Sequence, residues 1–264
     1  MELEEEYEMV ISNYIDLEKE SLDFAMLYML RTPVPYVDTF DARLALNRRL
    51  MNLLTSVRLY TDRLTDHCRA CLPKQSAIKE KVKSLLSTEY DNNFDFRFME
   101  ALRNYIQHRG TPVHQVIFGG RGVTLDTDRL LEFSSSFSVY KKVLASDRHF
   151  KQQILDEMPD NIDLISASRG YIESLSSIHN NIRHLISKTV NASRLPLQKA
   201  IDDYKSFYTE EFWGLTAYAF DGNTKIDEIP IFLNRDDIRV RLQQRNNPLS
   251  HLQKSFVTGR TKKQ

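Results

Sequence analysis

Residues 93–110, with the sequence NFDFRFMEALRNYIQHRG, form the stretch around which the rest of the chain is organised. Apolar side chains recur in it every three or four residues, which predicts one buried face of a helix. Asn93 or Asp95 can cap the start of this helix, and Gly110 and Pro112 end it. The apolar positions are Phe94, Phe98, Leu102, Tyr105 and Ile106.

Inside this helix lies the hexapeptide Arg103-Asn104-Tyr105-Ile106-Gln107-His108. Asn104 and His108 are four residues apart and share a helix face. Arg103 and His108 are five apart, and at roughly 100° per residue they point about 140° away from each other. One helix therefore cannot readily bring Arg103 and His108 to one point. Two copies of the helix packed about a two-fold axis can place both Arg–His pairs around one cleft.

This hexapeptide resembles the signature of the HEPN superfamily, which is Arg, a polar residue, three further residues and His on a helix. The resemblance covers one helix and its helical surroundings. It implies a bundle of four or five helices, dimerisation, and metal-independent RNA cleavage at the dimer interface. It also implies a bacterial toxin or a phage-defence effector.

The spacing of Arg and His is a weak signal by itself, because it recurs at Arg109…His114 and at Arg245…His251. The first of these spans Gly110 and Pro112, and the second contains Pro248, which breaks a helix. The Arg103…His108 match lies uninterrupted on an amphipathic helix.

The residue types suit attack of an RNA 2′-hydroxyl on the neighbouring phosphate without a metal or other cofactor. Arg103 can bind the phosphate and stabilise its charge, and His108 can act as general acid or base. Asn104 would orient His108 or the phosphate, and the product end would be a 2′,3′-cyclic phosphate. In the alternative interpretation, Arg103 forms a surface ion pair and His108 is a histidine that suits the negative end of the helix dipole.

The 264 residues carry 36 basic and 36 acidic side chains, so no global positive field attracts nucleic acid. RNA binding would need a local basic patch. The glutamate-rich start predicts a solvated helix face. The sequence contains no signal-peptide pattern and no apolar run long enough for a membrane span, so we expect a cytoplasmic protein without membrane contact. Six candidate RNA contacts are Arg48, Arg49, Lys79, Lys83, Arg109 and Arg121.

Cys68 and Cys71 form a C-x-x-C pair, whose spacing allows metal or redox chemistry. A zinc site needs further ligands, and there is no second pair. We expect structural thiols and no metal, and a zinc protein is kept as a third hypothesis.

The remaining pattern is mostly helical. Helices are expected over 2–30, 41–70, 73–88, 161–191, 196–211 and 235–245. The runs on either side of Gly119-Gly120-Arg121-Gly122 predict a β-hairpin with Arg121 at its tip. Residues 129–139 fit a strand or an irregular helix that leads into a helix over 140–157. Asp221-Gly222-Asn223 predicts the turn of a second hairpin.

These patterns predict a mainly α protein: a HEPN-like helical bundle with additional helices and one or two small β-hairpins. Residues 1–124 would form the bundle with the motif helix and a hairpin. Residues 125–256 would add helices and a C-terminal hairpin to the same body, and 257–264 would be a disordered basic tail. The leading hypothesis is a homodimeric endoribonuclease that needs a neutralising or activating protein. The alternative is a non-catalytic helical scaffold that uses the same helix as a dimer seam.

Overall fold

The computed structural model describes residues 1–31, 35–125, 128–208 and 214–258, and these are mainly helical, with small antiparallel sheets. The helices are α1 (Glu2–Leu30), α2 (Pro35–Cys71), α3 (Ile78–Asn92), α4 (Phe94–His108), α5 (Lys141–Leu144), α6 (Gln152–Glu157), α7 (Leu164–Phe207) and α8 (Asn234–Arg245). The strands are β1 (Gln115–Leu125), β2 (Asp128–Tyr140), β3 (Asn161–Asp163), β4 (Thr216–Asp221) and β5 (Thr224–Pro230).

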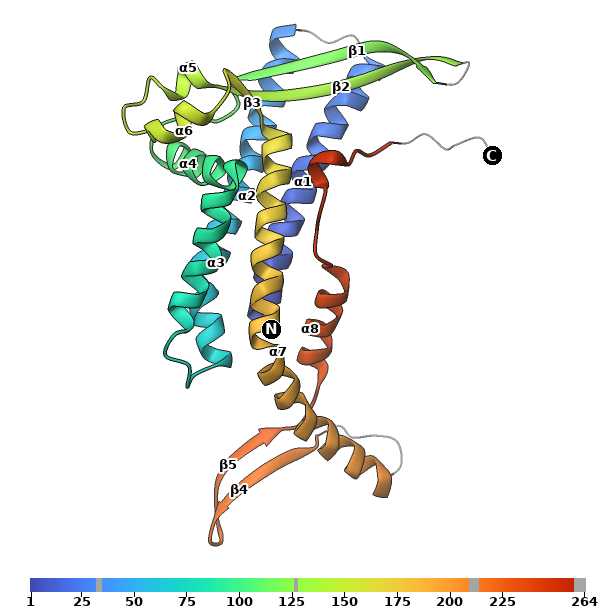
Figure 1. Ribbon diagram of the computed structural model, residues 1–264. Helices are drawn as coiled ribbons and strands as arrows, with labels where there is room; N and C mark the ends of the chain where they lie inside the picture. The colour runs from blue at the N-terminus through green and yellow to red at the C-terminus, as the bar shows by residue number, and fades with distance from the viewer. Residues whose placement is uncertain (32–34, 126–127, 209–213, 259–264) are drawn as a thin grey trace.

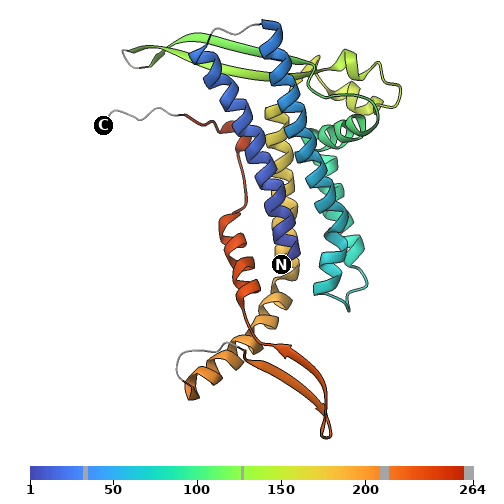
Figure 2. The ribbon, with the colours of Figure 1, turned by 180° about the vertical axis from the view of Figure 1, so that it is seen from behind.

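Three long helices, α1, α2 and the N-terminal part of α7 (its upper part in Figure 1), run side by side and form the body of the molecule (Figures 1 and 2). The sheet β1-β2-β3 lies across one end of this bundle, and β2 packs on α1. Helices α3 and α4 pack on α7 and α2, with α6 beside α4. The short helix α8 packs along α1 towards the other end (Figure 1).

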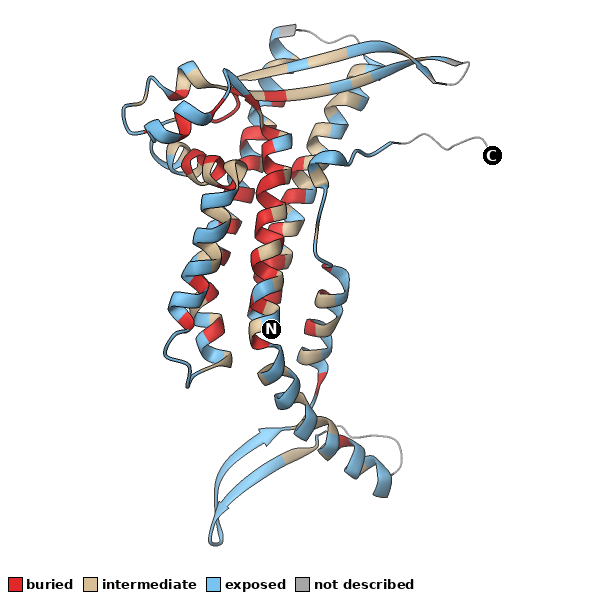
Figure 3. Cartoon of the chain, in the orientation of Figure 1, coloured by how far each residue is buried: buried red, intermediate tan, exposed pale blue. Residues whose placement is uncertain are grey.

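Buried residues concentrate where α1, α2, α4 and α7 meet (Figure 3). The largest fully buried side chains include Tyr7 of α1, Tyr60 of α2, Phe98 of α4 and Tyr171 of α7. Because these helices come from distant parts of the chain, the core joins the motif helix to both its N-terminal and its C-terminal neighbours.

The prediction for the motif helix is confirmed almost to the residue. The Asn93 side chain accepts hydrogen bonds from the backbone N–H groups of Asp95 and Phe96, as an N-cap does. Its amide donates to Ser174 Oγ of α7 at 2.7 Å. Phe98 and Leu102 are fully buried, so the cap and the apolar face together fix how α4 lies on α7.

Several predicted helix boundaries are wrong, among them both ends of the helix expected over 73–88, which is α3 over Ile78–Asn92. Helix α2 begins at Pro35 rather than near Asp41, because proline is well tolerated in the first turn of a helix. Residues 161–163 form β3, and α7 continues past the expected break as one helix with Pro196 inside it. Figure 1 shows the lower part of α7 turned away from the upper part, as an interior proline favours.

The first predicted hairpin has the wrong turn. Gly119, Gly120 and Gly122 lie inside the single strand β1, and Arg121 faces Glu132 across the ladder instead of occupying a tip. A Cβ at Gly120 would make only ordinary van der Waals contact with the Phe133 ring, so packing does not require a glycine there. Pairing along the whole of β2 therefore outweighs the turn tendency of glycine.

Residues 129–139 adopt the strand that the sequence left open against an irregular helix. The helix expected over 140–157 is wrong, because only α5 and α6 are helical there. The loop that separates them contains Asp147, which accepts a hydrogen bond from the His149 backbone N–H at 3.0 Å. This local bond holds the loop in a non-helical conformation.

The C-terminal hairpin forms as predicted, with Gly222 at a φ of 59° in its turn. All residues of β5 and nearly all of β4 are exposed. The predicted basic tail falls mainly on 259–264, outside the described residues. In the described part of the chain, no helix is both long and apolar enough to cross a membrane.

Candidate functional site

A cleft of about 270 Å³ lies beside the last turns of α4 and contains two of the three motif residues, Asn104 and His108. Both side chains are exposed, whereas Ala101, one turn earlier, is buried. The opposite wall is the α5–α6 loop. The complete lining is Ala101, Asn104, Tyr105, His108, Arg109, Asp147, His149, Phe150 and Lys151.

The α5–α6 loop adds a second histidine, His149, which lies beside the carboxylate of Asp147 and the guanidinium of Arg109. His149 Nδ1 lies 3.1 Å from Asp147 Oδ1 and 2.9 Å from Arg109 Nη2. Hydrogen bonds from the His149 backbone and side chain, with the nearby charges of Arg109 and His149, lower the pKa of Asp147 below its usual value. Asp147 is therefore ionised at neutral pH. A bond from His149 Nδ1 to Asp147 needs a proton on that nitrogen, whereas a bond from Arg109, which only donates, needs a lone pair there, so each tautomer of His149 satisfies one of the two contacts.

The floor of the cleft is aromatic and its rim is basic. The rings of Tyr105 and Phe150 meet edge to face with centroids 6.2 Å apart. Burial, with the Asp147 charge, raises the pKa of Tyr105, so its hydroxyl stays protonated at neutral pH. Lys151 donates to Tyr90 Oη at 2.8 Å, which holds its ammonium group near the rim. Arg109 and Lys151 outnumber the one carboxylate, so the lining is net positive even with neutral histidines.

Arg103 does not line this cleft. Its guanidinium donates to Gln107 Oε1 at 3.1 Å and to Asn104 Oδ1 at 2.8 Å, and its Nε lies 3.8 Å from Glu100 Oε2. That Nε is buried and has no hydrogen-bond partner among the described residues. Arg103 and His108 thus diverge within one chain, and Asn104 links the arginine to the cleft wall.

The other candidate RNA contacts are scattered. Arg109 lines the cleft. Arg49 is bound to Glu20 and Asp16 of α1, so it ties α2 to α1. Arg121 of β1 forms an ion pair with Glu132 of the neighbouring strand β2. Arg48, Lys79 and Lys83 are exposed on α2 and α3.

The cysteine pair has the character of structural thiols. Cys68 is fully buried, and burial raises its pKa to about 11, so it stays a thiol at neutral pH. Cys71 is half-buried, and burial also raises its pKa. Across residues 1–31, 35–125, 128–208 and 214–258, no group of three His, Cys, Asp or Glu side chains has the arrangement of a metal site.

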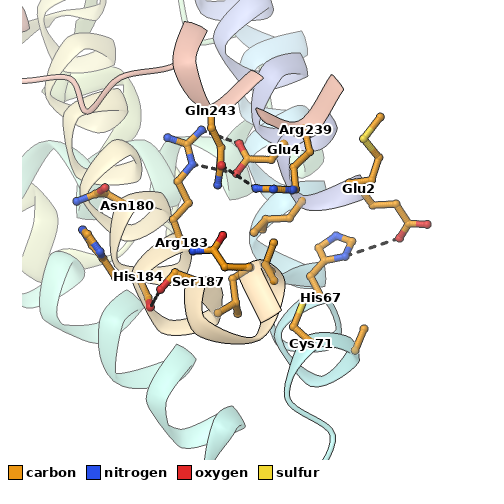
Figure 4. A pocket seen from close by; sticks show the side chains of 16 residues that line it. Glu2, Glu4, His67, Cys71, Asn180, Arg183, His184, Ser187, Arg239 and Gln243 are labelled. Carbon is orange, nitrogen blue, oxygen red and sulfur yellow. Dashed lines mark hydrogen bonds and ion pairs between the residues drawn. The ribbon is translucent and has the colours of Figure 1, made fainter. Parts of the chain in front are cut away.

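A larger cavity of about 530 Å³ lies at the other end of the bundle, between α1, α2, α7 and α8 (Figure 4). Arg183 of α7 and Arg239 of α8 project into it. Both guanidinium groups are neutralised by neighbouring acids, Arg183 by Glu4 and Arg239 by Asp236. The cavity therefore carries less net charge than its arginines suggest.

Behind this cavity is a buried polar network that joins α1, α2 and α7. Glu4 accepts two bonds from Arg183, at 2.9 and 2.6 Å, and one from His179 Nε2 at 3.2 Å. His179 Nδ1 lies 2.7 Å from the Tyr60 hydroxyl. Because a carboxylate only accepts, His179 carries its proton on Nε2, and Nδ1 accepts from Tyr60.

The network shifts the pKa values of its members. Burial alone would raise the pKa of Glu4, but the bonds and charges of His179 and Arg183 outweigh it and lower the pKa to about 2. Burial lowers the pKa of His179, so Arg183 supplies the positive charge that Glu4 needs at neutral pH. The prediction of a solvated acidic face is wrong here, because Glu4 and Glu6 are buried.

Sequence reasoning missed Asp147, His149 and Lys151 as members of the motif cleft. The short Asp147-Arg148-His149 segment is a detectable signal for a paired acid and histidine, but nothing local connects it to a motif some forty residues earlier. No protein-family model, curated protein or solved structure matches the chain.

Proposed function

We propose that the protein is a metal-independent endoribonuclease of the HEPN type, with its active site in the cleft beside α4. One observation carries the proposal. His108, the motif histidine, is exposed in a cleft whose other side chains include Arg109, His149 and Lys151. Two imidazoles and two permanent cations around a small hollow match the needs of a phosphodiester better than those of a neutral or cationic ligand.

The cleavage uses only groups of the protein and the RNA. The 2′-hydroxyl oxygen attacks the adjacent phosphorus as a base removes its proton. The bond from phosphorus to the 5′-oxygen then breaks as an acid protonates that oxygen. The products are a 2′,3′-cyclic phosphate and a 5′-hydroxyl. His108 transfers one of the two protons, and Arg109 and Lys151 bind the phosphate.

Arg103 enters this site from a second copy of the chain. It lies outside the cleft of its own chain, held by Asn104 and Gln107 on a neighbouring side of α4. Two α4 helices packed about a two-fold axis bring the Arg103 of each copy towards the His108 of the other. In the resulting homodimer, Arg103 stabilises the charge that develops on the phosphate.

Incubation of purified protein with labelled RNA in EDTA tests the activity. We expect wild type to cut, and His108→Ala to be slower by about 10²- to 10⁴-fold, because it loses one proton transfer. His184→Ala is the matched control, since His184 is also an exposed helical histidine but lines the other cavity. Equal rates for wild type and His108→Ala, or no cleavage of any RNA in a broad panel, would refute the proposal.

Co-expression of Arg103→Ala and His108→Ala chains tests the composite site. Each variant alone is expected to be inactive. In the mixture half of the dimers contain both chains, and each of these has one intact site of two, so about a quarter of wild-type activity should return. An Arg103→Ala protein that is fully active alone would place the arginine outside the reaction.

A further inference from the structure

The hairpin of β4 and β5 stands apart from the helix bundle (Figure 1). All residues of β5 and all residues of β4 after Thr216 are exposed, so both faces of the hairpin are open. Tyr218 and Phe220 lie on one face and are 52% and 60% exposed. A two-stranded hairpin alone is marginally stable in water, whereas three or more strands with an apolar face can be stable on their own. The hairpin therefore gains stability when another strand is added.

The two edges of the hairpin differ in chemistry. Strand β5 carries Lys225, Asp227 and Glu228 and ends at Pro230. Charged side chains and proline are the features that protect an edge strand from pairing with another chain. Strand β4, over Thr216–Asp221, has no proline and no charge before its last residue. An added strand would therefore pair with β4 and not with β5.

One hydrogen bond shows which backbone groups of β4 face outwards. Ile231 N–H donates to the carbonyl of Leu215 at 2.8 Å, so Leu215 directs its backbone groups towards β5. Because these groups alternate between the two sides of a strand, Thr216, Tyr218 and Phe220 direct theirs away from β5. Among the described residues no third strand pairs with this row of donors and acceptors. The outer edge of β4 thus has the backbone groups that an added strand needs.

The side chains of β4 fit a second β4 related by a two-fold axis. Residues that face each other in an antiparallel pair lie on the same side of the sheet. With the axis at Ala219, Tyr218 of each copy faces Phe220 of the other, and outward backbone groups meet outward backbone groups. Four aromatic rings then lie side by side on one face. A shift by one residue would put the rings of the two copies on opposite faces.

Charged groups border this aromatic strip. Lys225 and Glu228 face Phe220 and Tyr218 across the ladder of the hairpin. They form an ion pair with each other, and Lys225 Nζ lies 4.7 Å from the centre of the Tyr218 ring. The face would thus have an apolar centre and a charged rim, which is the usual arrangement of a protein interface.

We propose that the outer edge of β4 is a self-association site. A second copy of the chain adds its β4 antiparallel to the first, with the axis at Ala219, and a four-stranded sheet β5-β4-β4-β5 results. The hairpin lies at the far end of the molecule from α4, so this contact is separate from the proposed RNA site (Figure 1). One added strand pair is smaller than a standard interface. Pairing therefore needs a high protein concentration, and the hairpin of a dilute sample stays open.

Sedimentation velocity over a range of protein concentrations tests the association. We expect the average mass to rise reversibly towards twice the mass of the dilute species. Tyr218→Lys removes both aromatic pairs and puts a charge on the edge, so the dissociation constant should rise about 10-fold or more. Ile229→Lys is the matched control, because Ile229 is a similarly exposed β5 side chain on the other face of the hairpin. Circular dichroism checks that both variants keep the helix bundle.

Disulfide formation tests the register. At the axis, the two copies of Ala219→Cys would have Cα atoms about 4.5 Å apart, a distance that a disulfide spans. The two copies of Ala217→Cys would lie about 13 Å apart, which is too far. Both substitutions are made in a Cys71→Ser background, which removes the half-buried native thiol. Under mild oxidation we expect Ala219→Cys to form covalent dimers much faster than Ala217→Cys.

Three results would overturn the proposal. The first is an average mass that does not change with protein concentration up to the millimolar range. The second is an association that Tyr218→Lys leaves unchanged or that Ile229→Lys weakens equally. The third is a covalent dimer that forms as fast from Ala217→Cys as from Ala219→Cys.

Discussion

Glu4 shows how one buried residue couples folding to pH. Its pKa falls from 4.5 to about 2 in the folded chain, because Arg183 and His179 hold the charged form. Above pH 4.5 the carboxylate is ionised whether or not the chain is folded, and the full stabilisation is present. As the pH falls towards 2, the unfolded chain takes up a proton that the folded chain does not, so stability is lost.

Glu4→Gln should lower the free energy of unfolding at pH 7 by about 3 kcal/mol, because Arg183 loses its buried partner. It should also flatten the loss of stability between pH 4.5 and pH 2, in the window that the lowered pKa defines. Urea unfolding at several pH values measures both effects. The matched control is Glu5→Gln, which changes an exposed glutamate in the same turn. Equal effects of the two substitutions would contradict the account of the network.

His108 and His149 show which site residues can be predicted from the sequence and which cannot. His108 was found because it belongs to a motif contained in one helix. His149 was missed because its partners Arg109 and His108 lie forty residues away, and only the fold of the α5–α6 loop joins them. Glu4 was assigned to a solvated face because an acidic run looks polar from composition, whereas its partners come from α7.

At the element scale, α4 could be predicted because its signals are local. The cap, the apolar spacing and the terminal glycine all lie within eighteen residues. Strand β1 could not, since its glycines indicate a turn when taken alone and only pairing with β2 and packing against Tyr28 decide otherwise. Helix α7 likewise continues through Pro196 although the local rule predicts a break.

Asn93 gives a test of this element. Asn93→Ala removes the bonds to the N–H groups of Asp95 and Phe96 and the bond to Ser174, so unfolding should become easier by about 1–2 kcal/mol. Thermal and urea unfolding measure the change. Asn92→Ala is the control, because Asn92 is the exposed last residue of α3. If both substitutions have the same effect, the cap does not anchor α4.

At the scale of the whole molecule, burial is concentrated in the bundle, whereas the hairpin of β4 and β5, called the arm here, is exposed (Figure 3). Strands β4 and β5 pair with each other, and a two-stranded hairpin alone is marginally stable in water. Phe220, Ile226 and Ile229 are each at least 60% exposed. The arm therefore contributes little to the cooperative core.

Hydrogen exchange followed by mass spectrometry should reflect this division. Peptides from β4 and β5 should exchange much faster than peptides from the middle of α2 and the upper part of α7, because local opening of the hairpin costs little free energy. Ile229→Ser should change the free energy of unfolding by less than about 0.5 kcal/mol, whereas Phe98→Ser should cost several times more. Slow exchange in β4 and β5 would mean that the arm is covered in solution.

The two ends of the bundle differ in chemistry. The end with α8 holds charges matched in pairs around its cavity, as the contacts of Glu4 and Asp236 show. The end with α4 holds exposed histidines and an excess of cations in the cleft. Under the proposed function, the catalytic chemistry belongs to the α4 end, and the buried network at the other end stabilises the fold.

The most direct test of the central claim is the chemistry of the RNA ends made in EDTA. Mass spectrometry of the fragments should find 2′,3′-cyclic phosphates and 5′-hydroxyls, and the same RNA with a 2′-deoxy residue at the cut should resist. Both products should disappear with His108→Ala. Fragments with 3′-hydroxyl and 5′-phosphate ends would contradict the account, because attack by a 2′-hydroxyl cannot produce them, and so would cleavage that does not depend on His108.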